Sequence, residues 1–161
     1  MLNLRPAADS DRESIWQIFH EVVAGGDAFA FAPDTSRENA LAYWFSEEKR
    51  VFVAEEDGEI LGSYYVRPNQ KGGGVHVANA GYMVISVARG RGIARAMAEH
   101  SLEEAQRLGF RAMQFNFVVS TNASAVHLWK QLGFDIVGTL PGAFLHPRQG
   151  YVDVYVMYRN L

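Results

Sequence analysis

The chain has 161 residues, of which 48% are hydrophobic and 20% charged, and its formal net charge is -3. This length and composition are typical of a globular protein, so we expect a single domain over residues 1–161. The slightly acidic balance offers no basic surface for nucleic acid, and the absence of cysteine excludes disulfides and a thiol nucleophile. The five histidines show no metal-ligand spacing, and no apolar run has the length of a signal or membrane span. We therefore expect an unprocessed cytoplasmic protein with no metal and no membrane partner.

The N-terminal part of the chain is predicted to contain a short strand and two helices. Residues 2–5 alternate in polarity ahead of a proline, which favours a strand. Residues 10–13 match a capping box, and the apolar residues after them recur at helical spacing until Gly25. A second capping signature begins a shorter helix over residues 35–45. Between the helices lies a predicted loop in which Phe29 and Phe31 are candidates for contact with a ligand.

A hairpin and a glycine-rich connection follow. Residues 51–54 and 60–66 are apolar and β-branched or aromatic, and Asp57-Gly58 between them suits the positive φ angles of a tight turn. Residues 68–74 include three consecutive glycines and are predicted to be a flexible connection.

The remainder of the chain alternates between strands and helices. In order, we predict a central strand, a helix, a strand, a second helix and two final strands, over residues 75–87, 94–108, 112–119, 122–132, 134–140 and 151–158. Glycines follow both helices and are expected to end them. This order predicts an α/β fold built on one mixed sheet.

A glycine-rich turn joins the central strand to the next helix. Its residues are Arg89, Gly90, Arg91, Gly92, Ile93 and Ala94. Glycine allows a sharp turn that exposes backbone amides at a helix N-terminus, and the arginines add positive charge, so the turn is typical of a pyrophosphate site. A P-loop is excluded because no Gly-Lys-Ser/Thr occurs, and a dinucleotide fingerprint is excluded because Arg95 stands where a third small residue is needed. A plain strand-to-helix turn is the alternative.

These six residues match the R/Q-x-x-G-x-G/A signature of the GCN5-related N-acetyltransferases (GNAT family). A second block, residues 122–134, resembles that family's N-x-x-A-x-x-L-Y-x-x-x-G-F segment at the usual distance after the first. The resemblance implies a mixed, mostly antiparallel seven-stranded sheet with splayed central parallel strands and about four helices. It also implies transfer of the acetyl group of acetyl-CoA to the amine of a small metabolite by direct attack in a ternary complex.

The resemblance assigns roles to particular positions of this chain. The amides of residues 89–94 would hold the pyrophosphate, and the pantetheine arm would lie where the strand ending at Val87 splays from the strand around Phe115. A backbone amide at Met83 or Val84 would bond the acetyl carbonyl and stabilise the oxyanion during attack. Asn122 would contact the coenzyme from the other wall and would also cap its helix. The implied coenzyme-binding set is thus Met83, Val84, Arg89, Gly90, Arg91, Gly92, Ile93, Ala94, Asn122 and Trp129.

The chain departs from the family at two catalytic positions. Trp129 replaces a tyrosine thought to protonate the leaving thiolate, and an indole N–H cannot act as an acid at useful pH. A thiol with a pKa of about 8.5 can leave without one. A core aromatic is the alternative role for Trp129. No carboxylate lies in residues 75–87, so the general base is unassigned, with His76 or a water relay as candidates and a surface position as the alternative for His76.

Asn79 and Asn116 are amides within otherwise apolar predicted strands, where burial without a hydrogen bond is unfavourable. A neighbouring backbone group is one expected partner. The other is a substrate carboxylate, because the two positions resemble the subgroup of the yeast azetidine-2-carboxylate and proline-analogue N-acetyltransferases. On that interpretation they line the substrate pocket, roofed by Phe29 and Phe31, and the acceptor is an amino or imino acid.

Other functions remain open from the sequence. The acceptor is alternatively an amino-acid analogue used as an antibiotic or herbicide, such as phosphinothricin, or a protein N-terminus. From a different class, the missing tyrosine and base favour a non-catalytic acyl-CoA sensor. A homodimer is a further expectation from the family.

Overall fold

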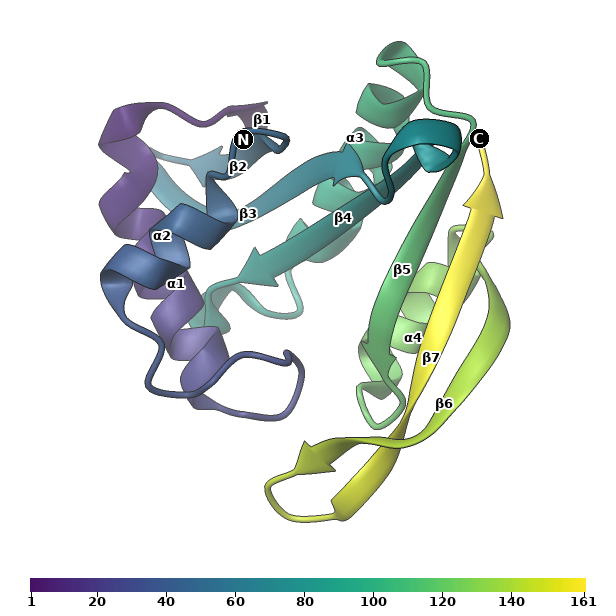
Figure 1. The fold of residues 1–161 in the computed structure, drawn as a ribbon. Coiled ribbons are helices and arrows are strands. Elements are labelled where there is room, and N and C mark those ends of the chain that lie inside the picture. Colours follow the sequence, from purple (N-terminus) through teal and green to yellow (C-terminus); the bar gives the residue numbers. More distant parts are fainter.

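A seven-stranded sheet forms the centre of the computed structural model, which describes residues 1–161 (Figure 1). The strands run in the order β1-β2-β3-β4-β5-β7-β6, and every neighbouring pair is antiparallel except β4 and β5. Their bounds are β1 Asn3–Pro6, β2 Arg50–Glu56, β3 Glu59–Pro68, β4 Val77–Val84, β5 Ala112–Val119, β6 Asp135–His146 and β7 Gly150–Asn160. The predicted mixed, mostly antiparallel sheet is confirmed.

Four helices cover the two faces of this sheet. They are α1 Arg12–Ala24, α2 Arg37–Trp44, α3 Ile93–Arg107 and α4 Ala123–Gln131, with short 3-10 turns at Asp9–Asp11, Gly72–Gly74 and Ser86–Ala88. The apolar sides of α1 and α2 pack against Val53, Tyr65 and Met83 on one face. The apolar side of α3 packs on the opposite face, and α4 packs beside it against Phe115. None of the helices is both long and apolar enough to cross a membrane.

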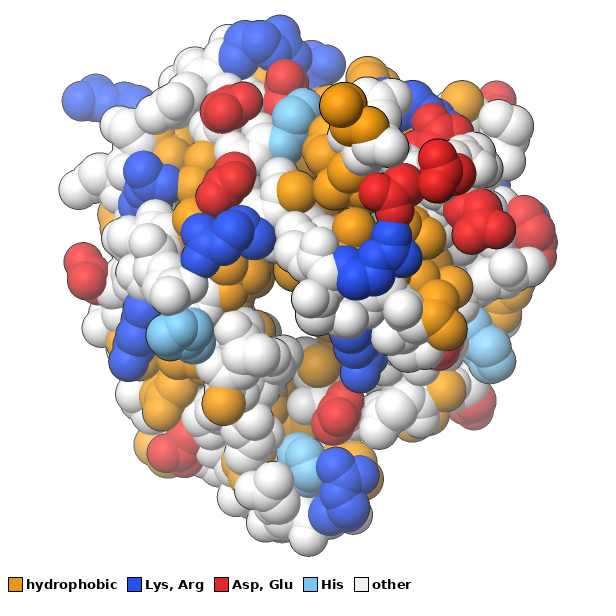
Figure 2. Space-filling model, turned by 180° about the vertical axis from the view of Figure 1, so that it is seen from behind, with side chains coloured by type: hydrophobic (Ala, Val, Ile, Leu, Met, Phe, Trp, Pro, Cys, Tyr) orange, Lys and Arg blue, Asp and Glu red, His pale blue; other side chains and the backbone are white.

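The two parallel strands separate soon after they meet. Pairing between β4 and β5 is limited to Val77 with Ala112 and Ala78 with Met113. Beyond this point the strands diverge toward their C-terminal ends, as predicted, and the diverging ends lie on either side of an open region of the molecule (Figure 1). The space-filling view shows the surface hollowed between the two halves (Figure 2).

Several predicted boundaries are corrected by the structure. β4 ends at Val84 rather than at residue 87, because Ile85 and the Ser86–Ala88 turn fold the chain toward α3. β6 continues well past residue 140, because a register shift after Leu140 accommodates the Pro141-Gly142 pair on this edge strand.

The first predicted capping box does not form as expected. No side chain caps α1, and the carboxylate of Asp11 instead accepts the Ala8 N–H at 2.7 Å and two hydrogen bonds from Arg5. The second predicted cap is confirmed, since Ser36 Oγ accepts the N–H of Asn39 at 3.1 Å. The predicted hairpin turn is confirmed by the positive φ angles of Asp57, 52°, and Gly58, 82°.

Candidate functional site

The glycine-rich turn presents a run of free backbone amides. Gly90 and Gly92 have φ angles of 78° and 79°, and neither has another part of the chain near the position of a Cβ atom. Gly92 precedes the first turn of α3, and no side chain caps that helix. The N–H groups of residues 90–95 donate no hydrogen bond within the chain, whereas the N–H of Ala96 donates to Gly92 O. Free amides at a helix N-terminus are the arrangement that suits an anion, as the sequence predicts for this turn.

Three arginines surround these amides, and two already contact acidic or amide side chains. Arg91 pairs with Glu56, and Arg95 bonds Glu99 and Gln131, while Arg89 has no ion pair. Both ion pairs are substantially exposed, so they contribute little and can exchange for a phosphate. The N–H of Arg95 is also free and adjoins the turn, although the sequence motif ends at Ala94. The rule that four N–H groups are free at every helix start could have found it.

The strand alternation decides which amide at the end of β4 faces the gap toward β5. Ile85 N–H donates to Leu61 O on β3, and backbone groups of alternate residues point to the same side of a strand. The Met83 amide therefore faces β3, and the Val84 amide faces the gap. Of the two predicted residues, Val84 has the orientation required to contact a ligand between the strands. Tyr82 shares that orientation and was missed, because the sequence does not give the register.

Trp129 is a core residue. It is 9% exposed, and its ring lies 4.6 Å from Phe115 and 5.1 Å from Tyr82, centroid to centroid. The alternative role predicted for Trp129 is thus confirmed, while contact with the coenzyme stays a prediction. Burial raises the pKa of Tyr82 well above its usual range, and the Tyr82 hydroxyl is bonded to Ser101 on α3.

Asn122 stands at the predicted N-cap position of α4 but does not cap the helix through its side chain. Its Oδ1 accepts only a long hydrogen bond, 3.3 Å, from the hydroxyl of Ser124. The predicted capping role is therefore wrong in this detail, and the amide keeps donors for another partner.

Asn79 lies at the point where β4 and β5 separate. It is 6% exposed, its Nδ2 donates to Gln114 O at 2.9 Å, and its Oδ1 accepts from Arg67 Nε at 3.2 Å. A backbone group is therefore the partner of its amide, which is the first of the two predicted possibilities. The side chain closes the sheet at the last position before the gap.

Asn116 is exposed, which corrects the expectation of a buried amide. The residue lies at the β5 register shift, where the chain bulges, and its side chain bonds Asn69 and Gln114. Because the Asn116 side chain is exposed to water, its hydrogen-bonding groups do not need a ligand as partner. A role for Asn79 and Asn116 in binding substrate stays a prediction.

Phe29 and Phe31 pack on the face covered by α1 and α2, which is also the face of Asn79. Phe31 lies 5.0 Å from Phe19 and 4.9 Å from Tyr43, centroid to centroid. These rings begin an aromatic row that continues to Tyr65, since the hydroxyls of Tyr43 and Tyr65 are 3.1 Å apart. The row leads from the loop toward β4.

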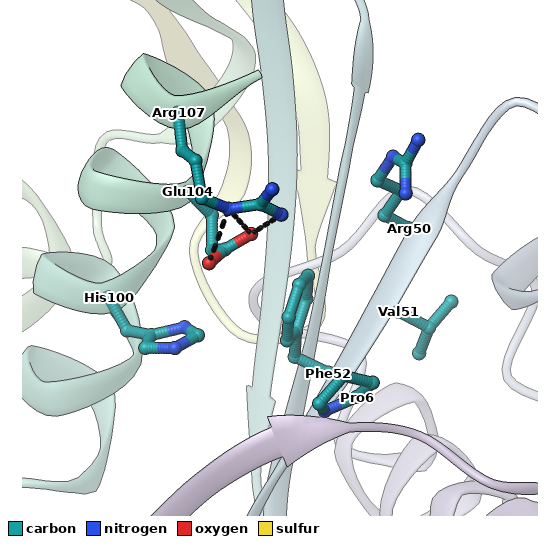
Figure 3. A pocket seen from close by; sticks show the side chains of 7 residues that line it. All are labelled: Pro6, Arg50, Val51, Phe52, His100, Glu104 and Arg107. Carbon is teal, nitrogen blue, oxygen red and sulfur yellow. Dashed lines mark hydrogen bonds and ion pairs between the residues drawn. The ribbon is translucent and has the colours of Figure 1, made fainter.

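Two surface pockets lie away from this region. One, of about 390 Å³, lies between β1, β2 and α3 and is lined by Pro6, Arg50, Val51, Phe52, His100, Glu104 and Arg107 (Figure 3). Within it, Glu104 accepts three hydrogen bonds from Arg107, and His100 bonds the Tyr64 hydroxyl. The other lies near the C-terminus and includes His76, which is exposed and stands at the opposite end of β4 from Val84. His76 is therefore a surface residue rather than the base.

No group of three or more His, Cys, Asp or Glu side chains is arranged to hold a metal ion. The charged side chains seen on the face of Figure 2 are of both signs and interspersed. The site is thus defined by the free amides of residues 90–95 and by the gap that begins after Asn79.

Comparison with known proteins is consistent with this geometry. A model described as the acetyltransferase (GNAT) family matches residues 13–134. A GCN5-related N-acetyltransferase from Kribbella flavida has a structure that superimposes with a TM-score of 0.96 and 45% identity, over 99% of this chain and 98% of that chain.

Two further relatives carry named activities. The N-acetyltransferase aca1 of Schizosaccharomyces pombe is 38% identical over 98 residues, 60% of this chain and 47% of the relative. The L-amino acid N-acetyltransferase AaaT of Escherichia coli is 34% identical over 112 residues, 68% of this chain and 67% of the relative. The chain spans about half the length of the Schizosaccharomyces relative.

Proposed function

The chain belongs to the acetyltransferase (GNAT) family of acetyl-CoA-dependent N-acetyltransferases, and we propose that its acceptor is the amine of an amino or imino acid. One observation supports acetyl-CoA as the acetyl donor: free amides at the start of α3 adjoin a gap between two parallel strands. Such a pair of features suits a long, phosphorylated thioester that threads between the strands. The activity named for the Escherichia relative supports an amino acid as the acceptor.

Different residues act on the coenzyme and on the acetyl group. The amides of residues 90–95 bind and orient the diphosphate, and Asn122 contacts the coenzyme from α4, on the other side of the gap. Bound acetyl-CoA supplies the thioester whose carbonyl the amine attacks. The N–H of Tyr82 or Val84, the two β4 amides that face the gap, donates to the carbonyl oxygen and stabilises the negative charge that develops there.

A carbon–nitrogen bond forms, and the carbon–sulfur bond breaks to release a thiolate. Trp129 stands where relatives have the proton-donating tyrosine, so the thiolate takes its proton from water, which a thiol pKa of about 8.5 permits. The proton of the attacking amine likewise leaves through water. Asn79 and Asn116, with the Phe29 and Phe31 loop, are the proposed walls of the acceptor pocket.

Release of free thiol from acetyl-CoA tests the proposal. The purified protein would be incubated with proline, azetidine-2-carboxylate, methionine, phosphinothricin, methionine sulfoximine and a short peptide. We expect release with at least one amino or imino acid and none without an acceptor. Release with the peptide alone would overturn the proposed acceptor and leave the family's chemistry intact.

A non-catalytic acyl-CoA sensor is the second candidate, because Trp129 replaces the family's tyrosine and no carboxylate lies on β4. A sensor would be stabilised against heat by acetyl-CoA but would never consume it. The same assay therefore separates the two functions.

A further inference from the structure

We infer that Lys49 and Arg67 form a binding site for the carboxylate of the acceptor, on the sheet face covered by α1 and α2. The inference rests on the proposed function and extends it to the recognition of one chemical group. Lys49 precedes β2 and Arg67 lies near the end of β3, so both are outside the two sequence motifs of the family.

These two residues stand out among the cations of the chain. Of the lysines and arginines that form no ion pair, three are partly buried, namely Lys49, Arg67 and Arg159. Burial of a cation without a counter-charge is unfavourable, so such a position needs an explanation. Arg159 lies on β7, at the far side of the sheet from the other two.

Lys49 is held against an aromatic platform. Its Nζ lies 3.3 Å from the centroid of Tyr43 and 4.5 Å from that of Tyr65, and it donates to Tyr43 O. The rings stabilise the ammonium through their negative faces, but they leave part of its charge uncompensated. Burial lowers the pKa of Lys49 to about 8, and the positive charge of Arg67 acts in the same direction.

Only one of the three guanidinium nitrogens of Arg67 donates a hydrogen bond. Its Nε donates to Asn79 Oδ1 at 3.2 Å, while its two terminal nitrogens make no hydrogen bond. Because Arg67 is paired with Asn79 across β3 and β4, its guanidinium stands where the gap between β4 and β5 begins.

Strand geometry brings the two cations to one face. Tyr65 and Arg67 are two residues apart on β3, so their side chains lie on the same side of the sheet. Lys49 lies over Tyr65 and is therefore a neighbour of Arg67. Glu48 is adjacent in the chain and its negative charge is felt by Lys49 and Arg67, but it is exposed and lies beyond ion-pair distance of both.

An anion placed between the two cations would compensate both charges. The free fork of a guanidinium matches the two oxygens of a carboxylate, and an ammonium adds a third donor. An amino or imino acid carries such a group beside its amine. The aromatic row from Phe29 to Tyr65 would pack on the acceptor's apolar part.

The test compares acceptors that differ only in the carboxylate. Proline would be paired with pyrrolidine, and methionine with 3-(methylthio)propylamine. In the parent we expect the amino acid to be acetylated with the lower KM. In Lys49→Met and Arg67→Gln the KM for the amino acid should rise by about ten- to a hundredfold, the value of a charge-assisted hydrogen bond, with the amine unaffected.

Arg50→Gln is the matched control. Arg50 follows Lys49 in the chain and carries the same charge, but it lines the pocket on the opposite face, whose lining also includes Phe52 and His100 (Figure 3). Its loss should leave every KM unchanged. Binding of acetyl-CoA to each variant, measured by thermal shift, shows that the variant is folded.

The outcomes separate this inference from the proposed function. Acetylation of amines with no preference for the carboxylate in the parent, or an unchanged preference in both variants, would overturn the inference and leave the function standing.

Absence of acetylation with every acceptor would overturn the function. The inference would then be judged by the pKa of Lys49, measured by NMR on labelled lysine in sodium acetate. A rise in that pKa with acetate in the parent, absent in Arg67→Gln, supports the anion site, and no rise rejects it.

Discussion

Gly92 shows how one residue directs the amides of the candidate coenzyme site. Its φ of 79° lies in the left-handed region, and it precedes the first turn of α3, where the free N–H groups point outward. An alanine there would be strained by roughly 1–2 kcal/mol, although no atom crowds the position of its Cβ. Relief of that strain would turn the amides away from the diphosphate.

We predict that Gly92→Ala weakens acetyl-CoA binding by about tenfold, as loss of one charge-assisted hydrogen bond would. The measurement is isothermal calorimetry. Gly58→Ala is the control, because Gly58 has a φ of 82° in an open turn far from the site. Both variants should lose similar stability, and equal loss of acetyl-CoA affinity in the two would contradict the role of the turn.

Asn79 is predicted to support the fold whether or not it binds substrate. In Asn79→Ala the carbonyl of Gln114 loses its donor at the start of the gap, which should lower the free energy of unfolding by about 1–3 kcal/mol. Asn116→Ala, at an exposed position, should change it by less than about 0.5 kcal/mol. Urea denaturation measures both. If Asn79→Ala lowered the free energy of unfolding no more than Asn116→Ala does, the hydrogen bond from Asn79 to Gln114 would contribute nothing to stability.

The sequence identified the turn at residues 89–94 because glycine spacing and positive charge are local properties. It could not identify Lys49 and Arg67, because their proximity depends on the pairing of β2, β3 and β4. It also could not choose between Met83 and Val84, since the direction of an amide depends on register. Local chemistry was predictable, and its arrangement in space was not.

At the scale of elements, β1 and α1 are joined by a buried ion pair. Asp11 is 5% exposed and its carboxylate accepts hydrogen bonds from Arg5 at 2.7 and 3.0 Å, and Arg5 also bonds Glu55 on β2. The hydrogen bonds from Arg5 hold the pKa of Asp11 below its usual range, while burial opposes them. This junction fixes the first strand at the edge of the sheet.

The junction should contribute to stability only above acidic pH. Since the pKa of Asp11 is lower in the folded state than the unfolded value of about 3.9, its contribution is present above that pH and is lost as the pH falls further. We predict that Asp11→Asn lowers the Tm at pH 7 and reduces the difference in Tm between pH 7 and pH 3. Asp34→Asn, in an exposed loop, is the control. An undiminished difference in Asp11→Asn would contradict the assignment.

Most elements were predictable because hydrophobic period and turn residues mark them. The errors fall where an apolar run does not follow one element. Residues 75–87 are largely apolar, but only Val77–Val84 form the strand, and the later residues enter a turn fixed by α3. β6 passes through Pro141 because an edge strand tolerates the lost N–H and a register shift absorbs it. Such tertiary effects leave no local pattern.

At the scale of the molecule, the two halves of the sheet are joined through the short pairing of β4 and β5. A ligand in the gap would contact β4, the start of α3 and α4, and so would connect both halves. We predict that acetyl-CoA at one hundred times its Kd adds about 2.7 kcal/mol of stability and raises the Tm by roughly 5–10 °C. A thermal scan measures it, with adenosine as the control. A shift equally large with adenosine would place the binding elsewhere.

Thiol release from acetyl-CoA, measured with and without the amino and imino acid panel, is the decisive test of acetyl transfer to an amino or imino acid. We expect release that depends on an acceptor bearing both an amine and a carboxylate. Tight acetyl-CoA binding with no release for any acceptor would contradict it and favour a sensor.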